Sequence, residues 1–204
     1  MVAKILLYEQ ERQLGTPARG ALLVADTGFE AKSGATATLL PGNVEVQTIN
    51  RSQVGSDDVM RGQIINSLDQ GPLIVNYFGH GSVTVWTGAG LLDSDSALGL
   101  TNNSKPTLFV MMTCLNGYAH DAYIDSLGES LLKSETGGAM AVWASSGFTE
   151  PGPQFTMNQM FYQQLFSSTG VRLGDAVRAA KGATPDSDVR RTWMLLGDPT
   201  MRIR

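Results

Sequence analysis

Two short apolar runs constrain the fold of this chain more than any other feature of its sequence. Residues 73–78 and 107–112 are apolar almost throughout and do not alternate with polar residues. Such runs are typical of strands that are buried on both faces, as in a parallel sheet covered by helices. The polar segment between them is long enough for a helical crossover. We therefore predict two neighbouring parallel strands in the middle of an α/β sheet.

Each of these runs leads to a residue with reactive chemistry. His80 follows the first run and stands between two glycines, and Cys114, the only cysteine, follows the second run. Parallel neighbours lie about 4.8 Å apart, and their carboxyl ends meet at the edge where open α/β sheets bind ligands. A thiol beside an imidazole is the simplest arrangement for nucleophilic acyl transfer. The sequence therefore predicts a cysteine peptidase site formed by His80 and Cys114.

Backbone donors for this chemistry are also predicted. Acyl transfer develops negative charge on the carbonyl oxygen, and preorganised N–H groups stabilise that charge. Gly81 can present its N–H beside His80, and the N–H of Cys114 is the second candidate donor. The glycines next to His80 also let a substrate backbone pass close to the site.

Composition and charge narrow the class of protein. The 204 residues fit one sizeable domain, and 42% hydrophobic with 17% charged residues is ordinary for a globular α/β core. A net charge of −4 offers no broad basic surface, so we expect no nucleic-acid partner. No apolar run approaches the roughly 20 residues that cross a bilayer, so we expect no membrane insertion. A single cysteine excludes internal disulfides.

The rest of the chain alternates strand-like and helix-like segments, which predicts a three-layer α/β sandwich with a mostly parallel sheet. We treat residues 1–204 as a single domain cut from a longer protein, without a signal peptide. Within it, residues 1–20 are predicted as a peripheral strand (4–8) followed by a polar loop. Further strands are expected at 21–26, 44–49 (an edge strand), 139–146 and 200–203. Helices are expected at 57–68, 91–100, 127–135, 155–167 and 173–181.

Several sequence blocks resemble the gingipain family of cysteine peptidases, which belongs to the caspase-like clan. The blocks are NYFGHGS at 76–82, MTCLNG at 112–117, GGA at 137–139 and LLGDPTMRI at 195–203. The resemblance covers roughly residues 21–204. It implies a caspase-like sheet flanked by helices, with His80 as the catalytic acid or base and Cys114 as the nucleophile. It also implies an oxyanion hole formed by the Gly81 and Cys114 amides.

The resemblance further implies endopeptidase activity on a polypeptide substrate, and export as part of a multidomain bacterial protein that is secreted or held at the cell surface. The chain departs from the pattern in three respects. The caspase signature Gln-Ala-Cys-Arg-Gly is absent, so specificity for aspartate is not implied. The chain is short beside well-known members, and no residue aligns with the carboxylate that orients the histidine.

The preference for a substrate side chain is predicted from acids and aromatic rings near the strand ends. Asp26, at the end of an early strand, and Asp121, in the loop after Cys114, could receive an arginine or lysine before the scissile bond. The alternative for Asp26 is a helix N-cap. Trp86 and Trp143 could wall such a side chain by cation–π stacking, or they could belong to the core.

The same residues also allow a different catalytic base or a metal site. His120, followed by Asp121, is a rival base within one loop. A zinc site from Cys114, His80 and His120 lacks motif spacing, so we predict no metal. Asp93 and Asp95 resemble half of a calcium loop, but a helix cap explains them as well, and we predict no cofactor.

Two other functions remain open at this point. The first is a catalytically inactive caspase-like module that binds a partner or forms a scaffold in a larger surface protein. The second is a nucleotide- or phosphate-binding domain, because residues 79–82 and 88–90 are rich in glycine, although neither segment matches a Walker or dinucleotide fingerprint.

Overall fold

The computed structural model describes residues 1–15 and 19–203, and its centre is a six-stranded sheet in the order β2-β1-β3-β6-β7-β8. The first five strands in this order are parallel, and β8 pairs antiparallel with β7 at the edge. The strands are β1 (Ala21–Ala25), β2 (Val46–Asn50), β3 (Ile74–Phe78), β6 (Thr107–Met112), β7 (Ala139–Ser145) and β8 (Trp193–Leu196). The predicted mostly parallel sheet is confirmed.

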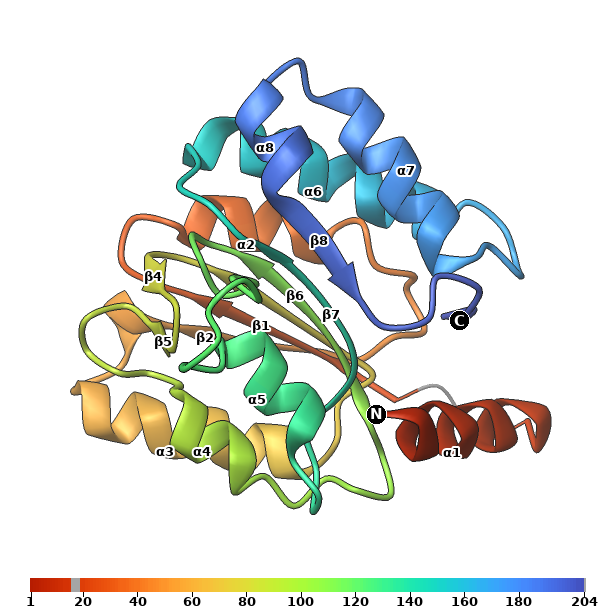
Figure 1. The fold of residues 1–204 in the computed structure, drawn as a ribbon, viewed down its shortest axis with the longest axis horizontal. Helices are drawn as coiled ribbons and strands as arrows, with labels where there is room; N and C mark the ends of the chain where they lie inside the picture. Colours follow the sequence, from red (N-terminus) through yellow and green to blue (C-terminus); the bar gives the residue numbers. More distant parts are fainter. Residues whose placement is uncertain (16–18, 204) are drawn as a thin grey trace.

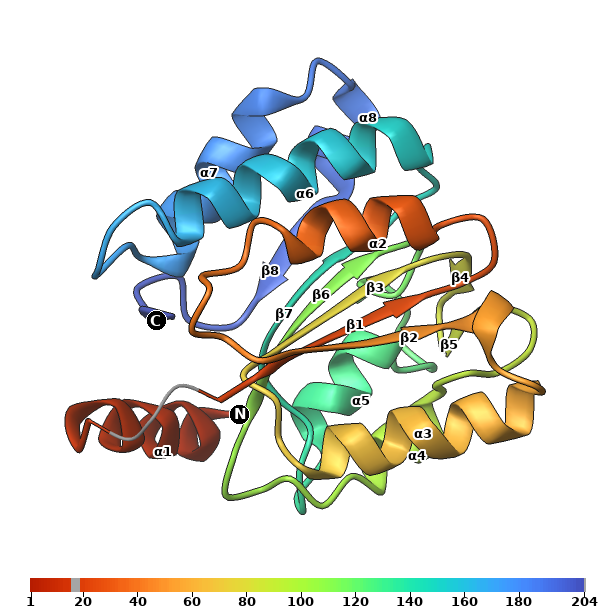
Figure 2. The same cartoon turned by 180° about the vertical axis from the view of Figure 1, so that it is seen from behind.

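Helices cover both faces of this sheet (Figures 1 and 2). One face carries α2 (Glu30–Ala37), α6 (Pro151–Leu165), α7 (Leu173–Ala183) and α8 (Ser187–Thr192). The other face carries α3 (Asp57–Asp69), α4 (Ser94–Leu98) and α5 (Leu127–Lys133). The three layers enclose two separate hydrophobic cores, one on each side of the sheet. The predicted three-layer α/β sandwich is therefore confirmed.

Burial on both faces explains the non-alternating sequence of the central strands. Every residue of β1, β3, β6 and β7 is buried. Along β1, β3 and β6, successive core side chains enter opposite cores, as do Ile74 and Val75 of β3. β2 lies at the edge of the sheet, as predicted, and is more exposed than the central strands.

Two of the predicted pocket residues belong to these cores. Trp86, in the short hairpin of β4 (Gly81–Ser82) and β5 (Val85–Trp86), is fully buried and stacks on Tyr77 at 4.1 Å between ring centroids. Trp143, on β7, is fully buried and stacks on Phe161 at 4.4 Å. Because neither ring has exposed surface, neither one walls a substrate pocket in this structure, and that prediction is corrected.

The amino-terminal segment is a helix, and the predicted strand at 4–8 is wrong. α1 (Val2–Gln13) buries Lys4 and Tyr8, which are four residues apart and share one helical face, whereas Leu6 is 58% exposed. A short apolar run such as residues 5–8 fits a strand or a helix equally well, and the good helix formers that follow it favour the helix. Residues 16–18 of the predicted loop, and Arg204, lie outside the described residues.

The strand predicted at 200–203 is also wrong. This segment makes only an isolated bridge between Arg202 and Arg172. Met201 and Ile203 are nearly fully buried, so their spacing of two reflects insertion into the core rather than strand pairing. The antiparallel edge strand of the sheet is formed just upstream, by β8.

Lys4 attaches α1 to the rest of the protein. Its Nζ donates hydrogen bonds to the carbonyl oxygens of Leu131 (3.2 Å), Leu132 (3.1 Å) and Gly137 (2.6 Å). The first two carbonyls belong to the carboxyl-terminal half of α5, where the helix dipole favours a cation. Burial nevertheless lowers the pKa of Lys4 to about 8, because desolvation penalises the charged ammonium.

We expect Lys4→Met to lower the free energy of unfolding by about 1–3 kcal/mol, because three carbonyls lose their donor while the apolar stem is kept. The deficit should widen between pH 8 and 10.5. In this window the folded wild type has released the Lys4 proton and the unfolded chain has not, so wild-type stability rises with pH. Urea unfolding at several pH values measures both effects. Exposed Lys105→Met is the control, and an equal response of the two variants would contradict this role of Lys4.

Candidate active site

The strand register brings His80 and Cys114 to the same edge of the sheet. β3 pairs in parallel with β6, and Phe78 lies opposite Met112 at the end of the ladder. His80 is two residues beyond Phe78, and Cys114 is two residues beyond Met112, so both leave the sheet at the same level. Adjacent strands are about 4.8 Å apart. The prediction that both residues follow neighbouring parallel strands is confirmed.

The two side chains also fall on the same face of the sheet. Ile74 and Phe78 of β3, and Leu108 and Met112 of β6, all enter the core beneath α2 and α6. The period of two along each strand assigns His80 and Cys114 to that face as well. In agreement, the imidazole packs edge-on against Phe29, at the start of α2, with 5.3 Å between ring centroids.

Contacts to the backbone hold the turn that carries His80. The His80 carbonyl accepts hydrogen bonds from the Tyr77 hydroxyl and from the Thr87 N–H, both at 2.8 Å. Burial raises the pKa of Tyr77, so its hydroxyl keeps the proton that it donates. A side chain at Gly79 would collide with the Tyr77 hydroxyl, which explains the glycine before the histidine.

The second glycine lies against the cysteine segment. A Cβ added to Gly81 would lie 2.5 Å from Thr113 Oγ1 and 3.2 Å from the Cys114 carbonyl oxygen. The two segments therefore touch directly after the strands end. The predicted oxyanion donors, the N–H groups of Gly81 and Cys114, come from this region of close contact, and their role stays a prediction.

Backbone hydrogen bonds and an unusual conformation shape the loop after Cys114. Leu115 has φ +61°, a left-handed conformation that is rare for a residue with a side chain. Its N–H donates to Gly147 (3.3 Å), and the N–H of Gly117 donates to Ser145 (2.8 Å). Both acceptors lie at the end of β7, so the neighbouring strand keeps the chain in this conformation.

A pocket of about 320 Å³ opens beside the half-buried cysteine. Besides Cys114, the pocket is lined by Phe148, Thr149, Glu150, Asp186 and Asp188. The thiol lies against one wall, where Sγ donates to the Thr149 carbonyl at 3.6 Å. The remaining lining combines a large, 78% exposed aromatic ring with three carboxyl groups.

Of these three carboxyl groups, one caps a helix and two are exposed. Asp186 caps α8 by accepting from the N–H groups of Asp188 (3.0 Å) and Val189 (2.8 Å). Glu150 and Asp188 are exposed. Within residues 1–15 and 19–203, none of the three forms an ion pair with a basic side chain. The pocket therefore presents negative charge toward solvent, next to the thiol.

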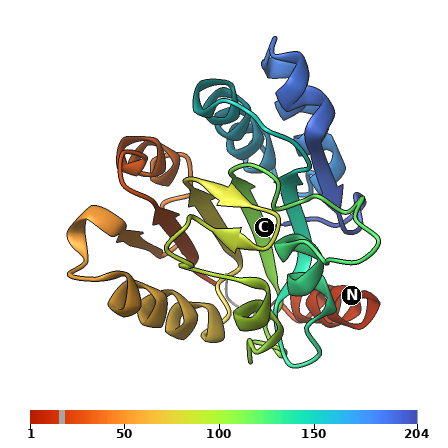
Figure 3. The ribbon, with the colours of Figure 1, turned by 60° about the vertical axis from the view of Figure 1, so that its left-hand side comes forward.

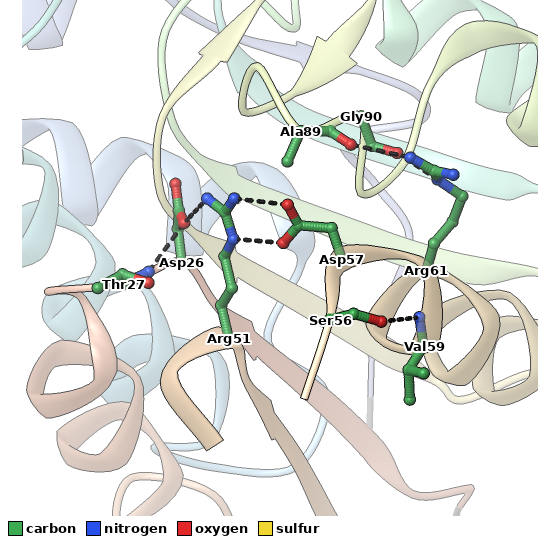
Figure 4. Close-up of polar contacts among 9 residues, drawn as sticks. All are labelled: Asp26, Thr27, Arg51, Ser56, Asp57, Val59, Arg61, Ala89 and Gly90. Carbon is green, nitrogen blue, oxygen red and sulfur yellow. Dashed lines mark hydrogen bonds and ion pairs between the residues drawn. The ribbon is translucent and has the colours of Figure 1, made fainter. Parts of the chain in front are cut away.

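Asp26, by contrast, is already paired with a cation. It is 2% exposed, and its Oδ1 accepts from Arg51 Nη1 (2.9 Å) and from the Thr27 N–H (2.8 Å) (Figure 4). Arg51 also holds Asp57 through two hydrogen bonds of 2.7 and 2.9 Å, which lower the pKa of that carboxyl group. Asp26 is therefore neither free for a substrate cation nor the N-cap of α2, which is Phe29, and the predicted substrate role is corrected.

The loop after Cys114 places the other candidates outside this pocket. Asp121 is exposed, and its carboxylate accepts from the N–H groups of Tyr123 (2.7 Å) and Ile124 (3.1 Å). His120 is exposed and packs on Tyr118, with ring centroids 5.2 Å apart. Neither residue lines the pocket beside Cys114.

Within the described part of the chain, no three or more His, Cys, Asp or Glu side chains are grouped so that they could hold a metal ion. Asp93 instead caps α4 by accepting from the Ser96 N–H at 2.8 Å. None of the helices in the described residues is long and apolar enough to cross a bilayer.

Sequence reasoning missed the residues that line the pocket opposite the thiol. Glu150 is the N-cap residue of α6. Asp186 and Asp188 begin α8, more than 70 residues after Cys114 (186 minus 114). No local pattern links these acids to the cysteine, because only the tertiary fold brings them to it.

Solved structures with the same fold include a cysteine proteinase. The Arg-specific cysteine proteinase gingipain R is 21% identical, with a TM-score of 0.78 over 91% of this chain and 47% of that one. A complex of the pro- and mature domains of RgpB from Porphyromonas gingivalis is 19% identical, with a TM-score of 0.75 over 91% of this chain and 48% of that one. Another protease is 18% identical, with a TM-score of 0.79 over 98% of this chain and 52% of that one. This chain thus spans about half the length of these relatives.

The likeness to gingipain R confirms the caspase-like architecture that the sequence blocks implied. No curated protein sequence matches the chain. The profile of peptidase family C25, however, matches residues 1–204, which is the whole sequence. With its mostly parallel sheet and its histidine and cysteine at one edge, the chain belongs to peptidase family C25.

Proposed function

We propose that this chain is a cysteine endopeptidase domain in which His80 and Cys114 form the catalytic dyad. The observation that carries the proposal is the register of β3 on β6, because residues 80 and 114 each lie two positions beyond the last paired residues, Phe78 and Met112. Membership of a peptidase family and a pocket beside the thiol support it. Peptide hydrolysis is the reaction that this combination serves best.

The mechanism follows from the chemistry of the two side chains. A free thiol has a pKa near 8.5, so it is mostly protonated at neutral pH. His80 takes the proton from Cys114, and the thiolate attacks the scissile carbonyl carbon. The N–H groups of Gly81 and Cys114 are proposed to stabilise the oxyanion. His80 then protonates the leaving amine, and water hydrolyses the acyl-enzyme.

We further propose a preference for a basic residue before the scissile bond. The acids that we assign to this preference are Glu150 and Asp188, which face the pocket beside Cys114 and lack an internal cation within the described residues. A carboxylate next to the nucleophile binds an arginine or lysine side chain by a charge-assisted hydrogen bond. A solved relative described as Arg-specific is consistent with this assignment.

The setting of the domain is also a proposal. Because the chain matches only about half of each relative, we propose that it is one peptidase domain of a longer bacterial protein that is secreted or displayed at the surface. The partners that we propose are a polypeptide substrate and further domains of the same chain. A pro-domain is the partner in one of the solved relatives.

The first test replaces the proposed nucleophile and both histidines. We expect Cys114→Ala and His80→Ala each to lower kcat/KM for peptide cleavage at least about a thousandfold, because each removes a participant in covalent catalysis. His120→Ala is the matched control and should keep wild-type activity. Circular dichroism checks that every variant is folded. Full activity in folded Cys114→Ala would reject the dyad, and an inactive wild type would favour a non-catalytic binding module.

The second test addresses the acidic pocket. We expect Glu150→Gln combined with Asp188→Asn to lower kcat/KM for substrates with arginine before the scissile bond by about tenfold or more, the value of one charge-assisted hydrogen bond. Cleavage after neutral residues should change little. A peptide library that varies this position measures both quantities. Asp121→Asn is the control outside the pocket, and an unchanged ratio of basic to neutral cleavage in the double variant would refute the assignment.

A further inference from the structure

One buried side chain bridges the two segments that carry His80 and Cys114. Asn116 is fully buried, and its Nδ2 donates hydrogen bonds to the carbonyl oxygens of Ser82 (2.5 Å) and Val85 (3.2 Å). These carbonyls belong to the hairpin of β4 and β5, which begins directly after His80. Figure 3 shows this hairpin in yellow, in front of the carboxyl ends of the strands. The contact joins residues 34 positions apart in the chain.

The bridge depends on the nitrogen of the amide. Both partners are backbone carbonyls, which only accept hydrogen bonds, so the side-chain NH₂ has to point toward them. The amide oxygen, Oδ1, is also buried, but it has no hydrogen-bond partner within residues 1–15 and 19–203. A buried polar atom without a partner costs stability.

Asn116 is rigidly connected to the cysteine. Its own N–H donates to the Cys114 carbonyl at 2.8 Å, and its carbonyl accepts from the Gly128 N–H at 2.9 Å. Between them, Leu115 is held at φ +61°, a left-handed conformation that is unfavourable for a residue with a side chain. Because this short segment is held in one conformation by its hydrogen bonds, the position of Asn116 constrains the position of Cys114.

The other end of the bridge is rigidly connected to the histidine. The Thr87 N–H donates to the His80 carbonyl, which closes the base of the hairpin. The Val83 carbonyl, at its tip, accepts from the Leu127 N–H at 2.8 Å, so the segment after Asn116 holds the hairpin at a second point. The hairpin that follows His80 is thus attached to the cysteine loop.

We infer that Asn116 is a positioning residue, whose amide fixes the separation between the His80 imidazole and the Cys114 sulfur. Beyond the last paired residues, Phe78 and Met112, the sheet ladder no longer sets the distance between the two segments. Beyond that point, the Asn116 amide sets the distance between the segments that carry His80 and Cys114. This inference rests on the proposed function, since it assigns the amide to the dyad.

The chain offers a matched control at the opposite edge of the sheet. Asn102 is also a buried asparagine whose Nδ2 donates to backbone carbonyls, those of Lys105 (3.2 Å) and Gly138 (3.1 Å). It lies beside Thr107, where β6 begins, whereas Asn116 lies just beyond the end of β6. Replacing either residue with leucine, which is close to asparagine in shape, removes a bridging donor without adding charge.

The experiment measures how fast iodoacetamide alkylates Cys114 at pH 7, together with kcat and KM for peptide cleavage. The thiolate is the form that reacts, and an imidazole within reach of a thiol promotes its formation. We expect Asn116→Leu to slow alkylation at pH 7 about tenfold or more, because the imidazole no longer stands within reach of the sulfur. kcat should fall about tenfold, with KM changed less than about twofold.

Asn102→Leu should lower the midpoint of thermal unfolding while leaving the alkylation rate at its wild-type value. If Asn116→Leu does not fold, the smaller Asn116→Ser should fold and show the same slowing in part. Wild-type alkylation in a folded Asn116 variant would overturn the inference, as would an equal slowing in Asn102→Leu. A wild type that cleaves no peptide overturns the proposed function instead, and the alkylation rates still decide whether Asn116 couples the two groups.

Discussion

The parallel pairing of β3 with β6 is the interaction on which the site depends. Phe78 lies opposite Met112, and the side chains of both strands enter the same two cores in alternation. A slip of one residue would send the side chains of one strand to the opposite face. Cys114 would then leave the sheet on the other side from His80. The hydrophobic cores therefore fix the geometry of the polar site above them.

Much of this geometry could be predicted, because burial on both faces leaves a direct signature in the sequence. Residues 73–78 and 107–112 lack polar alternation, and both are central strands of a parallel sheet. The same reasoning failed at residues 4–8, where four apolar residues fit either a strand or a helix. It also failed for Trp86 and Trp143, since a sequence does not say whether an aromatic ring near a strand end faces a pocket or a core.

The parts of the site that could not be predicted come from distant segments. Asp188 reaches the cysteine pocket because α8 lies across the end of β7, and nothing near it in the sequence marks it as a pocket residue. Asn116 stood inside a recognised block, but its contacts with Ser82 and Val85 appear only once the β4–β5 hairpin is folded back. The periodicity of apolar residues indicates which face of a strand or helix is buried, but it does not indicate which loops contact one another.

The sheet edge also shows how a protein separates structural acids from acids that can meet a ligand. Asp26 follows a central strand, but it is buried and already forms an ion pair with Arg51. Glu150 and Asp188 stand where no basic side chain of the described residues reaches them. In an internal ion pair the two charges largely cancel each other, whereas the negative potential of an unpaired carboxylate attracts a cation that approaches from solvent. Pairing, rather than the mere presence of an acid, therefore decides which carboxylates remain available to a cation from outside the protein.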